Sequence, residues 1–391
     1  MKPTRNIWLM YVIALLQGMI FYGPIATLYR HSAGISVFQI TIIESICLAL
    51  CLILELPWGI AADKIGYKKT MLICCCLYFL SKIVFWKAYT FGAFLTERIL
   101  LSIVISGLSG VDNSILYLSG DRENSQKVFG IYNSLNTVGL LFASAVYSIF
   151  VRDNYRLAGF LTVCSYGIAM ILAFWMVEVK NTEHKEARSE TKEFAELLKR
   201  TLSNKKLILF LISIALINET HQTITVFLNQ IQYTKCGLSN SVIGYIYIGV
   251  TLIGLLGVFS ERLTRKLGNM LLATILFGAA GTACIILGVT NLAWLSVAAI
   301  AVLRISFSLF QPLQADMQSR QVVSQHRATE LSTNAVIINC VSIGMNLIYG
   351  KLSDINLSFA MAAGAVLCFT GFLLFTISQG GKRIVSTQES I

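Results

Sequence analysis

The stretch Gly59-Ile60-Ala61-Ala62-Asp63-Lys64-Ile65-Gly66-Tyr67-Lys68-Lys69 decides the fold, because it is a short polar turn with three lysines between two long apolar runs. Apolar segments of similar length recur on both sides of it to the end of the chain. An α-helix rises 1.5 Å per residue, so about twenty residues cross the hydrocarbon core of a bilayer. The stretch is therefore predicted to be a tight cytoplasmic link between two membrane-spanning helices.

The composition excludes a soluble single-core protein. Of 391 residues, 55% are hydrophobic and only 13% are charged, which indicates a polytopic membrane protein whose partner is the lipid bilayer. The net charge of +11 does not indicate nucleic acid, because the basic residues are spread through short loops. Nine of the ten cysteines lie inside apolar runs and no CxxC pair occurs, so we expect packing residues, with no metal or cofactor.

Twelve charge-poor segments are long enough to span a membrane. The first is read as a retained span because no small-residue cleavage site follows it. The charge-free run 267–303 is too long for one helix, and residues 288–291 offer a turn that divides it. The predicted spans are 7–28, 37–61, 70–86, 92–118, 128–150, 157–177, 207–231, 238–260, 268–287, 292–314, 331–350 and 357–378.

The loop charges predict the orientation. With the N-terminus taken as cytoplasmic, 22 Lys and Arg residues fall on the cytoplasmic side and 6 on the opposite side, Arg30 among the latter. Cytoplasmic loops carry the excess of basic residues, so both termini are predicted to lie on the cytoplasmic side of the cell (inner) membrane. The longest loop divides the chain into six spans plus six. The predicted parts are an N-terminal six-helix bundle (1–179), a cytoplasmic linker (180–206), a C-terminal six-helix bundle (207–380) and a cytoplasmic tail (381–391).

An internal repeat relates these two bundles. A shift of about two hundred residues places Gly34-Ile35-Ser36 on Gly237-Leu238-Ser239, and Gly59 with Asp63-Lys64 on Gly257 with Glu261-Arg262. Offsets that stay close to two hundred residues across five helices indicate two homologous halves in parallel orientation. Such an architecture predicts a substrate site between the halves near the middle of the membrane, reached alternately from either side.

The chain resembles the major facilitator superfamily of secondary transporters over nearly its whole length. The family's loop between helices two and three reads G-x-x-x-D-[RK]-x-G-[RK]-[RK]-[RK], and the matching residues here are Gly59, Asp63, Lys64, Gly66, Lys68 and Lys69. Tyr67 departs from this pattern, since the family usually has a basic residue there. In relatives that residue pairs with an acid at the inner end of helix four, for which Asp121 is the candidate. The resemblance implies an all-α protein of twelve helices in two pseudo-symmetric six-helix bundles.

These residues, with the second copy, are predicted to form an inner gate. Gly59 and its counterpart Gly257 allow helices to approach closely, and Gly66 permits a sharp reversal. Asp63 at a helix end can contact the positively polarised N-terminus of a facing helix or a lysine. The simpler alternative is that the lysines only enforce topology. The gate residues of the second copy are Gly257, Glu261 and Arg262.

Charges inside spans are costly and are therefore functional candidates. Glu219 and Arg304 both fall near the middle of their spans, which makes Glu219 the first candidate for a proton-linked carboxylate and Arg304 its partner or a substrate anchor. A permanent pair that only packs the C-terminal half is the alternative. Asp112 and Glu44 are further candidates for proton coupling.

Polar and aromatic residues inside the spans are predicted to line a substrate cavity. Arg98 resembles the fourth-helix arginine of proton-coupled drug exporters, although it could also extend to the membrane surface. His221 could titrate near neutral pH, or be an ordinary hydrogen-bonded residue. The predicted cavity residues are Gln17, Tyr22, Arg98, Asn218, His221, Gln222 and Arg304.

These features predict a transporter and not an enzyme, because neither a nucleotide-binding loop nor a catalytic constellation occurs in the sequence. The expected activity is proton-coupled export of a drug-like or amphipathic small molecule by a monomer that works by alternating access. Two alternatives are open: proton-coupled uptake of a sugar, amino acid or organic anion, and a non-transporting membrane sensor on the same fold.

Overall fold

The computed structural model describes residues 3–119, 125–179, 198–321 and 327–380, and in these ranges the chain forms helices and turns without a strand. Eleven helical segments in these ranges are long and apolar enough to cross a membrane. One of them, Asn240–Val289, has 50 residues and contains two predicted spans. Gly268 breaks it with a φ of 77°, so the described chain carries the twelve spans of the predicted fold.

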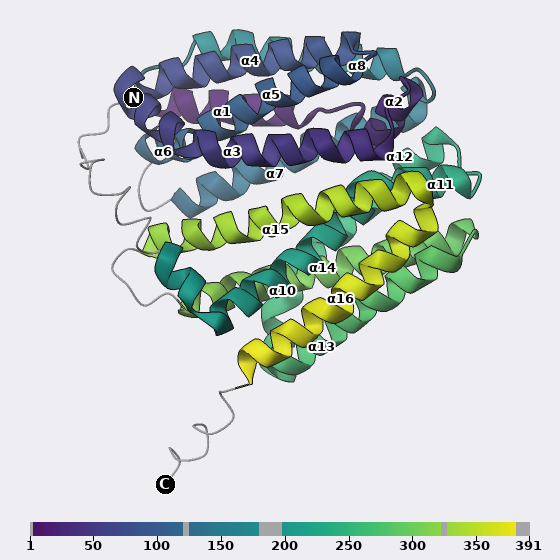
Figure 1. The fold of residues 1–391 in the computed structure, drawn as a ribbon. Coiled ribbons are helices and arrows are strands. Elements are labelled where there is room, and N and C mark those ends of the chain that lie inside the picture. Colours follow the sequence, from purple (N-terminus) through teal and green to yellow (C-terminus); the bar gives the residue numbers. More distant parts are fainter. Residues whose placement is uncertain (1–2, 120–124, 180–197, 322–326, 381–391) are drawn as a thin grey trace. The chain divides into compact units, whose positions relative to one another are not determined.

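The described chain divides into two compact units, Met1–Lys185 with Leu238–Gly249, and Glu186–Gly237 with Val250–Ile391. In the first unit α4 packs against α5 and α8, α3 against α5, and α1 against α7 (Figure 1). The first predicted span is not one straight helix, since α1 ends before Pro24 and a short 3₁₀ turn leads into α2. The elements of this unit are α1 (Pro3–Gly18), η1 (Gly23–Ile25), α2 (Ala26–Ser32), α3 (Val37–Ile65), α4 (Tyr67–Lys87), α5 (Phe91–Leu108), α6 (Val111–Ser119), α7 (Ser125–Val146), the π-helix η3 (Tyr147–Val151), α8 (Tyr155–Phe174) and most of α12 (Asn240–Ile253).

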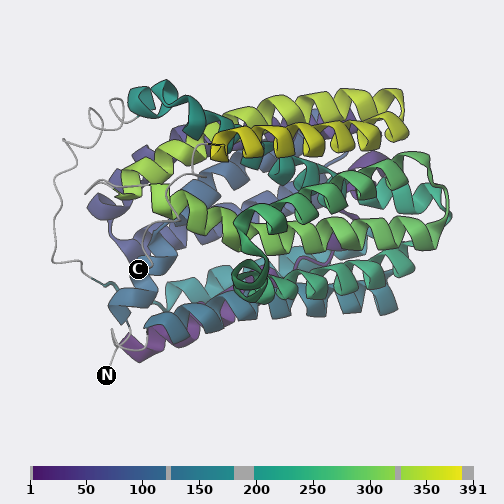
Figure 2. The same ribbon diagram turned by 90° about the horizontal axis from the view of Figure 1, so that it is seen from below.

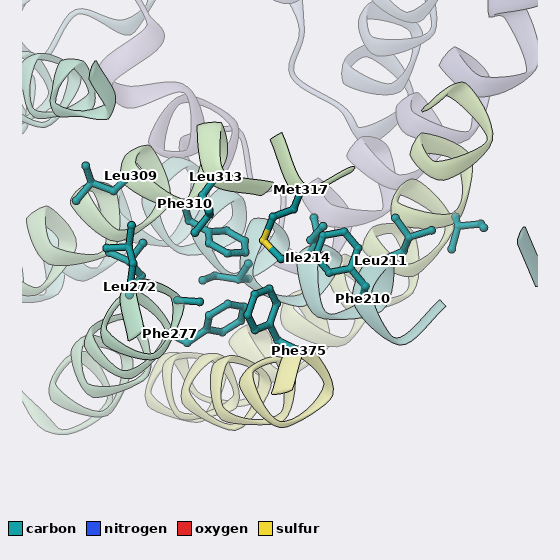
Figure 3. Close-up of a cluster of buried hydrophobic side chains, with 14 residues drawn as sticks. Phe210, Leu211, Ile214, Leu272, Phe277, Leu309, Phe310, Leu313, Met317 and Phe375 are labelled. Atoms are coloured by element: carbon teal, nitrogen blue, oxygen red, sulfur yellow. The ribbon is translucent and has the colours of Figure 1, made fainter. Parts of the chain in front are cut away.

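The second unit is built around α13, which packs against both α14 and α16, while α10 packs against α15 and α16. Figure 2 shows the two yellow helices α15 and α16 side by side. A cluster of buried side chains lies between α10, α13, α14 and α16, and in it the rings of Phe277, Phe310 and Phe375 are fully buried (Figure 3). The elements are α10 (Lys205–Gln222), the π-helix η4 (Thr223–Leu228), α11 (Asn229–Lys235), η5 (Gly254–Phe259), α13 (Ser260–Val289), α14 (Ala293–Gln321), α15 (Arg327–Ile355) and α16 (Leu357–Gln379).

Two pairs of glycines mark the same turns in the two halves of the sequence. Gly34 and Gly237 have φ angles of 82° and 80°, and Gly66 and Gly268 have 99° and 77°. Each lies between two helices, where a positive φ reverses the chain at little cost only for glycine. The conformation at these turns therefore repeats with the offset found in the sequence.

Helices α1 and α7 touch through their backbones. A Cβ atom on Gly139 would lie 2.2 Å from the carbonyl oxygen of Leu15, and one on Gly18 would lie 2.1 Å from that of Asn136. Only glycine permits this approach, in which dispersion contacts between backbones hold the two helices together.

We expect Gly139→Ala to lower the free energy of unfolding by about 1–3 kcal/mol, because the added methyl group must push α1 away. The control is Gly130→Ala on the same helix, where a Cβ meets nothing within 4 Å. Alanine should slightly stabilise the helix there, since it has the higher helix propensity. Thermal unfolding of the purified protein measures both. A Gly139→Ala protein as stable as Gly130→Ala would contradict the close packing.

Candidate functional site

Five ionisable side chains meet inside the first unit and are called the charge cluster from here on. They come from four helices: Arg30 from α2, Glu44 from α3, Lys82 from α4, and Glu97 and Arg98 from α5. Arg30, Lys82 and Glu97 are at most 4% exposed, whereas Glu44 and Arg98 are 13% and 20% exposed. In α3, α4 and α5 the members of the cluster lie five to seven residues, or roughly 8–10 Å, from the nearer end of the helix. The cluster is therefore buried at membrane depth.

Glu44 bridges the two arginines of the charge cluster. Its Oε1 atom lies 2.5 Å from Arg98 Nη2 and 3.4 Å from Arg30 Nη1. An unpaired charge in surroundings that exclude water costs several kcal/mol, so buried charges are usually found in ion pairs of this kind. A change in the charge of Glu44 would therefore affect both guanidinium groups at once.

Glu97 has three cationic neighbours, but all at long distances. Its carboxylate oxygens lie 3.8 Å from Arg98 Nε, 4.0 Å from Arg30 Nη2 and 4.0 Å from Lys82 Nζ. Its Oε2 atom is buried and accepts no hydrogen bond, and the Nε atoms of Arg30 and Arg98 are buried without an acceptor. The charge cluster is thus electrostatically paired but incompletely hydrogen-bonded.

Lys82 is held in an aromatic environment. Its ammonium group donates a hydrogen bond to Tyr22 Oη at 3.1 Å. It also lies 5.2 Å and 5.1 Å from the ring centres of Tyr78 and Tyr166, within the range of cation–π attraction. Together with Arg30 and Arg98, Lys82 gives the charge cluster three cations, which face two carboxylates.

The charge cluster unites predicted with unpredicted residues. Of its five members, Glu44 and Arg98 are predicted from the sequence to have functional roles, as is Tyr22, the hydrogen-bond partner of Lys82. Arg30, Lys82 and Glu97 are not, and Arg30 is counted there with the outer loops. The structure places Arg30 in a helix and not in a loop, because α2 continues to Ser32 and the Arg30 side chain is only 2% exposed. The presence of Lys82 and Glu97 inside apolar runs was a signal that the sequence already contained.

Asp112 and Gln17 lie elsewhere in the first unit. Asp112 on α6 accepts a hydrogen bond of 2.8 Å from Tyr132 Oη on α7, and its other oxygen is buried without a partner. Gln17 is buried and donates to the thiol of Cys75 at 3.5 Å. Neither contact joins these residues to the charge cluster.

A second polar group lies in the second unit, around the end of α10. Arg304 Nη1 on α14 is 3.4 Å from His221 Nε2, and the imidazole stacks on Phe307 with ring centres 3.8 Å apart and planes at 4°. Glu219 is buried and accepts a hydrogen bond of 2.7 Å from Thr223 Oγ1. Pairing of Glu219 with Arg304 stays a prediction. Of the other predicted cavity residues, Asn218 is half-buried and Gln222 exposed.

The backbone changes its winding directly after these residues. Residues Thr223–Leu228 form a π-helix, a rare conformation that occurs preferentially at functional positions in helices. The side chains of Asn229, Gln230 and Gln232 beyond it are buried. Gln232 donates to the carbonyl oxygen of Thr290 and to Ser296 Oγ, each at 3.1 Å.

Because Gly254 has no side chain, the guanidinium group of Arg304 can occupy the space beside it. A Cβ atom on Gly254 would lie 2.6 Å from Arg304 Nη2. We expect Gly254→Ala to displace the guanidinium group from His221 with little loss of stability, because the end of an arginine side chain is flexible. Solute binding or transport should fall by about tenfold if Arg304 anchors the solute, a loss that corresponds to one good contact of about 1.4 kcal/mol. Gly249→Ala on α12, where a Cβ meets nothing within 4 Å, is the control. Equal transport by both variants would argue against a role for Arg304.

The predicted inner gate surrounds the turn between α3 and α4. Gly59 and Lys64 lie on the last turns of α3, Gly66 forms the turn, and Lys68 and Lys69 lie on the first turn of α4. The side chain of Asp63 and all of Asp121 lie outside the residues that the structure describes.

Glu178 contacts the turn of the predicted inner gate and is not among the residues predicted from the sequence. Its carboxylate accepts a hydrogen bond of 3.1 Å from the backbone N–H of Lys68, and a Cβ atom on Gly66 would lie 3.0 Å from it. A carboxylate at this position satisfies a free N–H group of α4 and interacts favourably with the positive end of the helix dipole. Glu178 follows α8, so this contact joins the end of the first six predicted spans to the turn.

The second copy of the predicted gate has different contacts. Gly257 lies where η5 meets α14, and a Cβ atom there would be 2.7 Å from the carbonyl oxygen of Ser308. Glu261 pairs with Arg265 at 2.5 Å on the exposed surface of α13, and the guanidinium of Arg262 lies 5.8 Å from the ring centre of Phe259. Gly257 therefore lies at a close contact between two helical segments, as the sequence predicts.

The fold and the buried charges define a multi-pass membrane protein, and the sequence identifies its family. Residues 7–344 match the Major Facilitator Superfamily. The chain therefore belongs to this superfamily of transporters. No curated protein matches the sequence at a significant level.

Several solved structures share the fold. A mutant of the nucleoside transporter NupG has a TM-score of 0.80 at 14% identity, over 96% of this chain and 99% of that one. A D-xylose–proton symporter has a TM-score of 0.73 at 13% identity, over 97% of each chain. A POT family transporter in complex with 5-aminolevulinic acid has a TM-score of 0.73 at 12% identity, over 96% of each chain. At these identities the likeness concerns the fold alone.

Proposed function

We propose that the chain is a secondary active transporter that works by alternating access and couples the movement of its solute to protons. The observation that carries this proposal is the charge cluster, in which Glu44 is shared by Arg98 and Arg30 at membrane depth. Buried ionisable groups of this kind are costly, and in transporters they mark paths for protons or charged solutes.

Glu44 is the proposed proton-binding group of the charge cluster. It is the more exposed of the two carboxylates, at 13% against 2% for Glu97, so a proton reaches it more readily. Protonation would remove one anion from between Arg30 and Arg98 and leave two like charges facing each other. Repulsion between them favours a rearrangement of α2, α3 and α5, and a change in the relative energy of two conformations is what alternating access requires.

The proposed setting is the cell (inner) membrane, with both termini cytoplasmic and the protein a monomer. In this orientation the turn at Gly66 and the second copy around Gly257 lie on the inner side, where they act as gates. The charge cluster then lies in the outer half of the membrane, since the turns next to it, 33–36 and 88–90, face outward.

Two directions of transport are candidates. The resemblance of Glu55-Leu56-Pro57 and Arg98 to bacterial efflux proteins favours export of an amphipathic molecule in exchange for protons. The other candidate is uptake together with protons, and the charges of the cluster favour it because they do not suit a cationic solute. Three cations against two carboxylates repel a cationic solute, and protonation of Glu44 increases this repulsion.

Reconstituted protein distinguishes these functions. Liposomes would carry a pH-sensitive dye and an imposed pH gradient, and xylose, uridine, leucine, benzoate or tetraphenylphosphonium would be added on either side. Co-transport accelerates proton flux when solute and protons start in the same compartment, and exchange does so when they start in opposite compartments. Proton flux that no solute changes in either arrangement would contradict proton-coupled transport and support the sensor.

We expect Glu219→Gln to reduce the proton flux driven by solute at least about tenfold if Glu219 also carries a proton, because an amide cannot ionise. Solute binding and solute exchange without a pH gradient should persist. Asp316→Asn, which removes an exposed carboxylate paired with Arg320 in the same unit, is the control. An unchanged response to the gradient in Glu219→Gln would rule Glu219 out.

A further inference from the structure

We propose that the charge cluster binds the anionic group of the transported solute, a carboxylate or a phosphate. This inference rests on the proposed transport function and adds the chemical class of the solute. No described contact supplies the anion that the three cations lack.

The charge balance is the first argument. Arg30, Lys82 and Arg98 face only Glu44 and Glu97, which leaves an excess of one positive charge when all five groups are ionised. An uncompensated charge at membrane depth is costly, and an anion is the ligand that removes this cost. A neutral solute leaves the excess unchanged, and a cation increases it.

Unused hydrogen-bond donors are the second argument. The Nε atoms of Arg30 and Arg98 are buried without an acceptor, and Arg30 as a whole is only 2% exposed. Guanidinium groups present several N–H donors in one plane, which suits carboxylate and phosphate oxygens. The charge cluster therefore offers hydrogen bonds as well as charge to an oxyanion.

The exposed edge of the charge cluster fixes the side of approach. The stacked rings of Tyr22 and Phe85 cover the most buried cations of the cluster, since Tyr22 accepts a hydrogen bond from Lys82 and the centre of the Phe85 ring lies 5.6 Å from the guanidinium group of Arg30. Glu44 and Arg98 are the most exposed members, so the anionic group enters beside them and the rest of the solute stays outside the cluster.

Proton binding and anion binding should support each other. Glu44 faces Arg30 from α2 and Arg98 from α5. The other charged groups follow behind these two: Glu97 from α5 lies near both arginines, and Lys82 from α4, which is bonded to Tyr22, lies near Glu97. Protonation of Glu44 releases both guanidinium groups and raises the cation excess of the charge cluster from one to two, so an anionic group binds more strongly when it takes the place of the Glu44 carboxylate. The solute and the proton would therefore bind, and move, together.

Binding to the purified full-length protein tests the inference without a membrane gradient. The probes share one apolar ring: benzoate, phenyl phosphate, benzyl alcohol and benzylammonium, measured by equilibrium dialysis at constant ionic strength with gluconate as the balancing anion. We expect at least one of the two anions to bind about tenfold more tightly than the alcohol or the ammonium compound. Benzoate and phenyl phosphate distinguish a carboxylate from a phosphate. Equal binding of all four, or tighter binding of benzylammonium, would overturn the inference.

Lys82→Met supplies a second measurement that does not depend on the choice of probe. Methionine keeps an apolar chain of similar length and removes the excess charge, so the melting temperature without ligand should rise and the preference for anions should disappear. Lys87→Met on the exposed end of the same helix is the control and should leave the anion preference unchanged. A Lys82→Met protein that melts lower and still prefers anions would show that the cluster has no cation excess to neutralise.

The two proposals can fail separately. Anion binding without proton uptake, measured by the pH change of a weakly buffered solution, would support the anion site and contradict proton coupling at Glu44. Gradient-driven transport of a neutral solute without any anion preference would support the transport function and overturn the anion site.

Discussion

Replacing Glu44 by glutamine is expected to abolish the response of transport to a pH gradient. Glutamine has nearly the same shape but cannot exchange a proton, so the bridge between Arg98 and Arg30 would be permanently weakened. The protein would resemble the protonated state at every pH. Solute-driven proton flux in liposomes should fall at least about tenfold, whereas binding of the solute at neutral pH should persist or become tighter.

Glu55→Gln is the matched control for this experiment. Glu55 lies on the same helix, α3, and is exposed, so its replacement changes the net charge equally without touching the charge cluster. A Glu44→Gln protein whose proton flux still depends on the solute would assign proton binding elsewhere, with Glu97, Asp112 and Glu219 as the next candidates.

Replacing Glu97 by glutamine is expected to cause a large loss of stability. Glu97 is 2% exposed and lies within 4.0 Å of charged atoms of Arg30, Lys82 and Arg98. Without its charge, three buried cations would face Glu44 alone. Removing one partner of a buried ion pair costs about 3–5 kcal/mol, because the remaining charge is left uncompensated. Thermal unfolding of the purified protein should show this as a clearly lowered melting temperature.

A double variant separates charge from packing in this result. Lys82→Met combined with Glu97→Gln removes one cation together with the anion, so the melting temperature should recover by at least half of the loss. Additive effects of the two substitutions would contradict a direct electrostatic interaction between Lys82 and Glu97. Glu55→Gln again provides the control for loss of an exposed carboxylate.

The spans were predictable because hydrophobicity and length are local properties of the chain. The division of the run 267–303 near residue 290 agrees with the end of α13 at Val289 and the start of α14 at Ala293. Gly66 was predictable as a turn because its polar, glycine-containing context lies between two apolar runs. Backbone polar groups in lipid must be hydrogen-bonded within a helix, so the length of an apolar run in the sequence directly predicts a span.

The composition of the charge cluster was only partly predictable. Hydrophobicity gives the depth of a charged residue in its span, but it does not say which neighbouring helix the side chain faces. Depth makes Glu44 a candidate, and depth together with the resemblance to drug exporters makes Arg98 one, but their 2.5 Å contact depends on the packing of α3 against α5. Arg30 was misplaced because the break after α1 hides the continuation of the helix to Ser32. Glu178 lay in what read as a loop, so its contact with Lys68 depended on tertiary structure.

The π-helix Thr223–Leu228 accommodates extra residues within one turn, so side chains beyond it are rotated relative to an uninterrupted α-helix. Each residue of an α-helix corresponds to about 100° of rotation. The segment can therefore direct His221 toward Arg304 at one end and Gln232 toward Thr290 and Ser296 at the other. Deleting one residue in this segment would restore regular winding and turn one of these two faces away from α14. The seventh predicted span thus behaves as two short helices with separate orientations, joined without a loop that would expose the backbone to lipid.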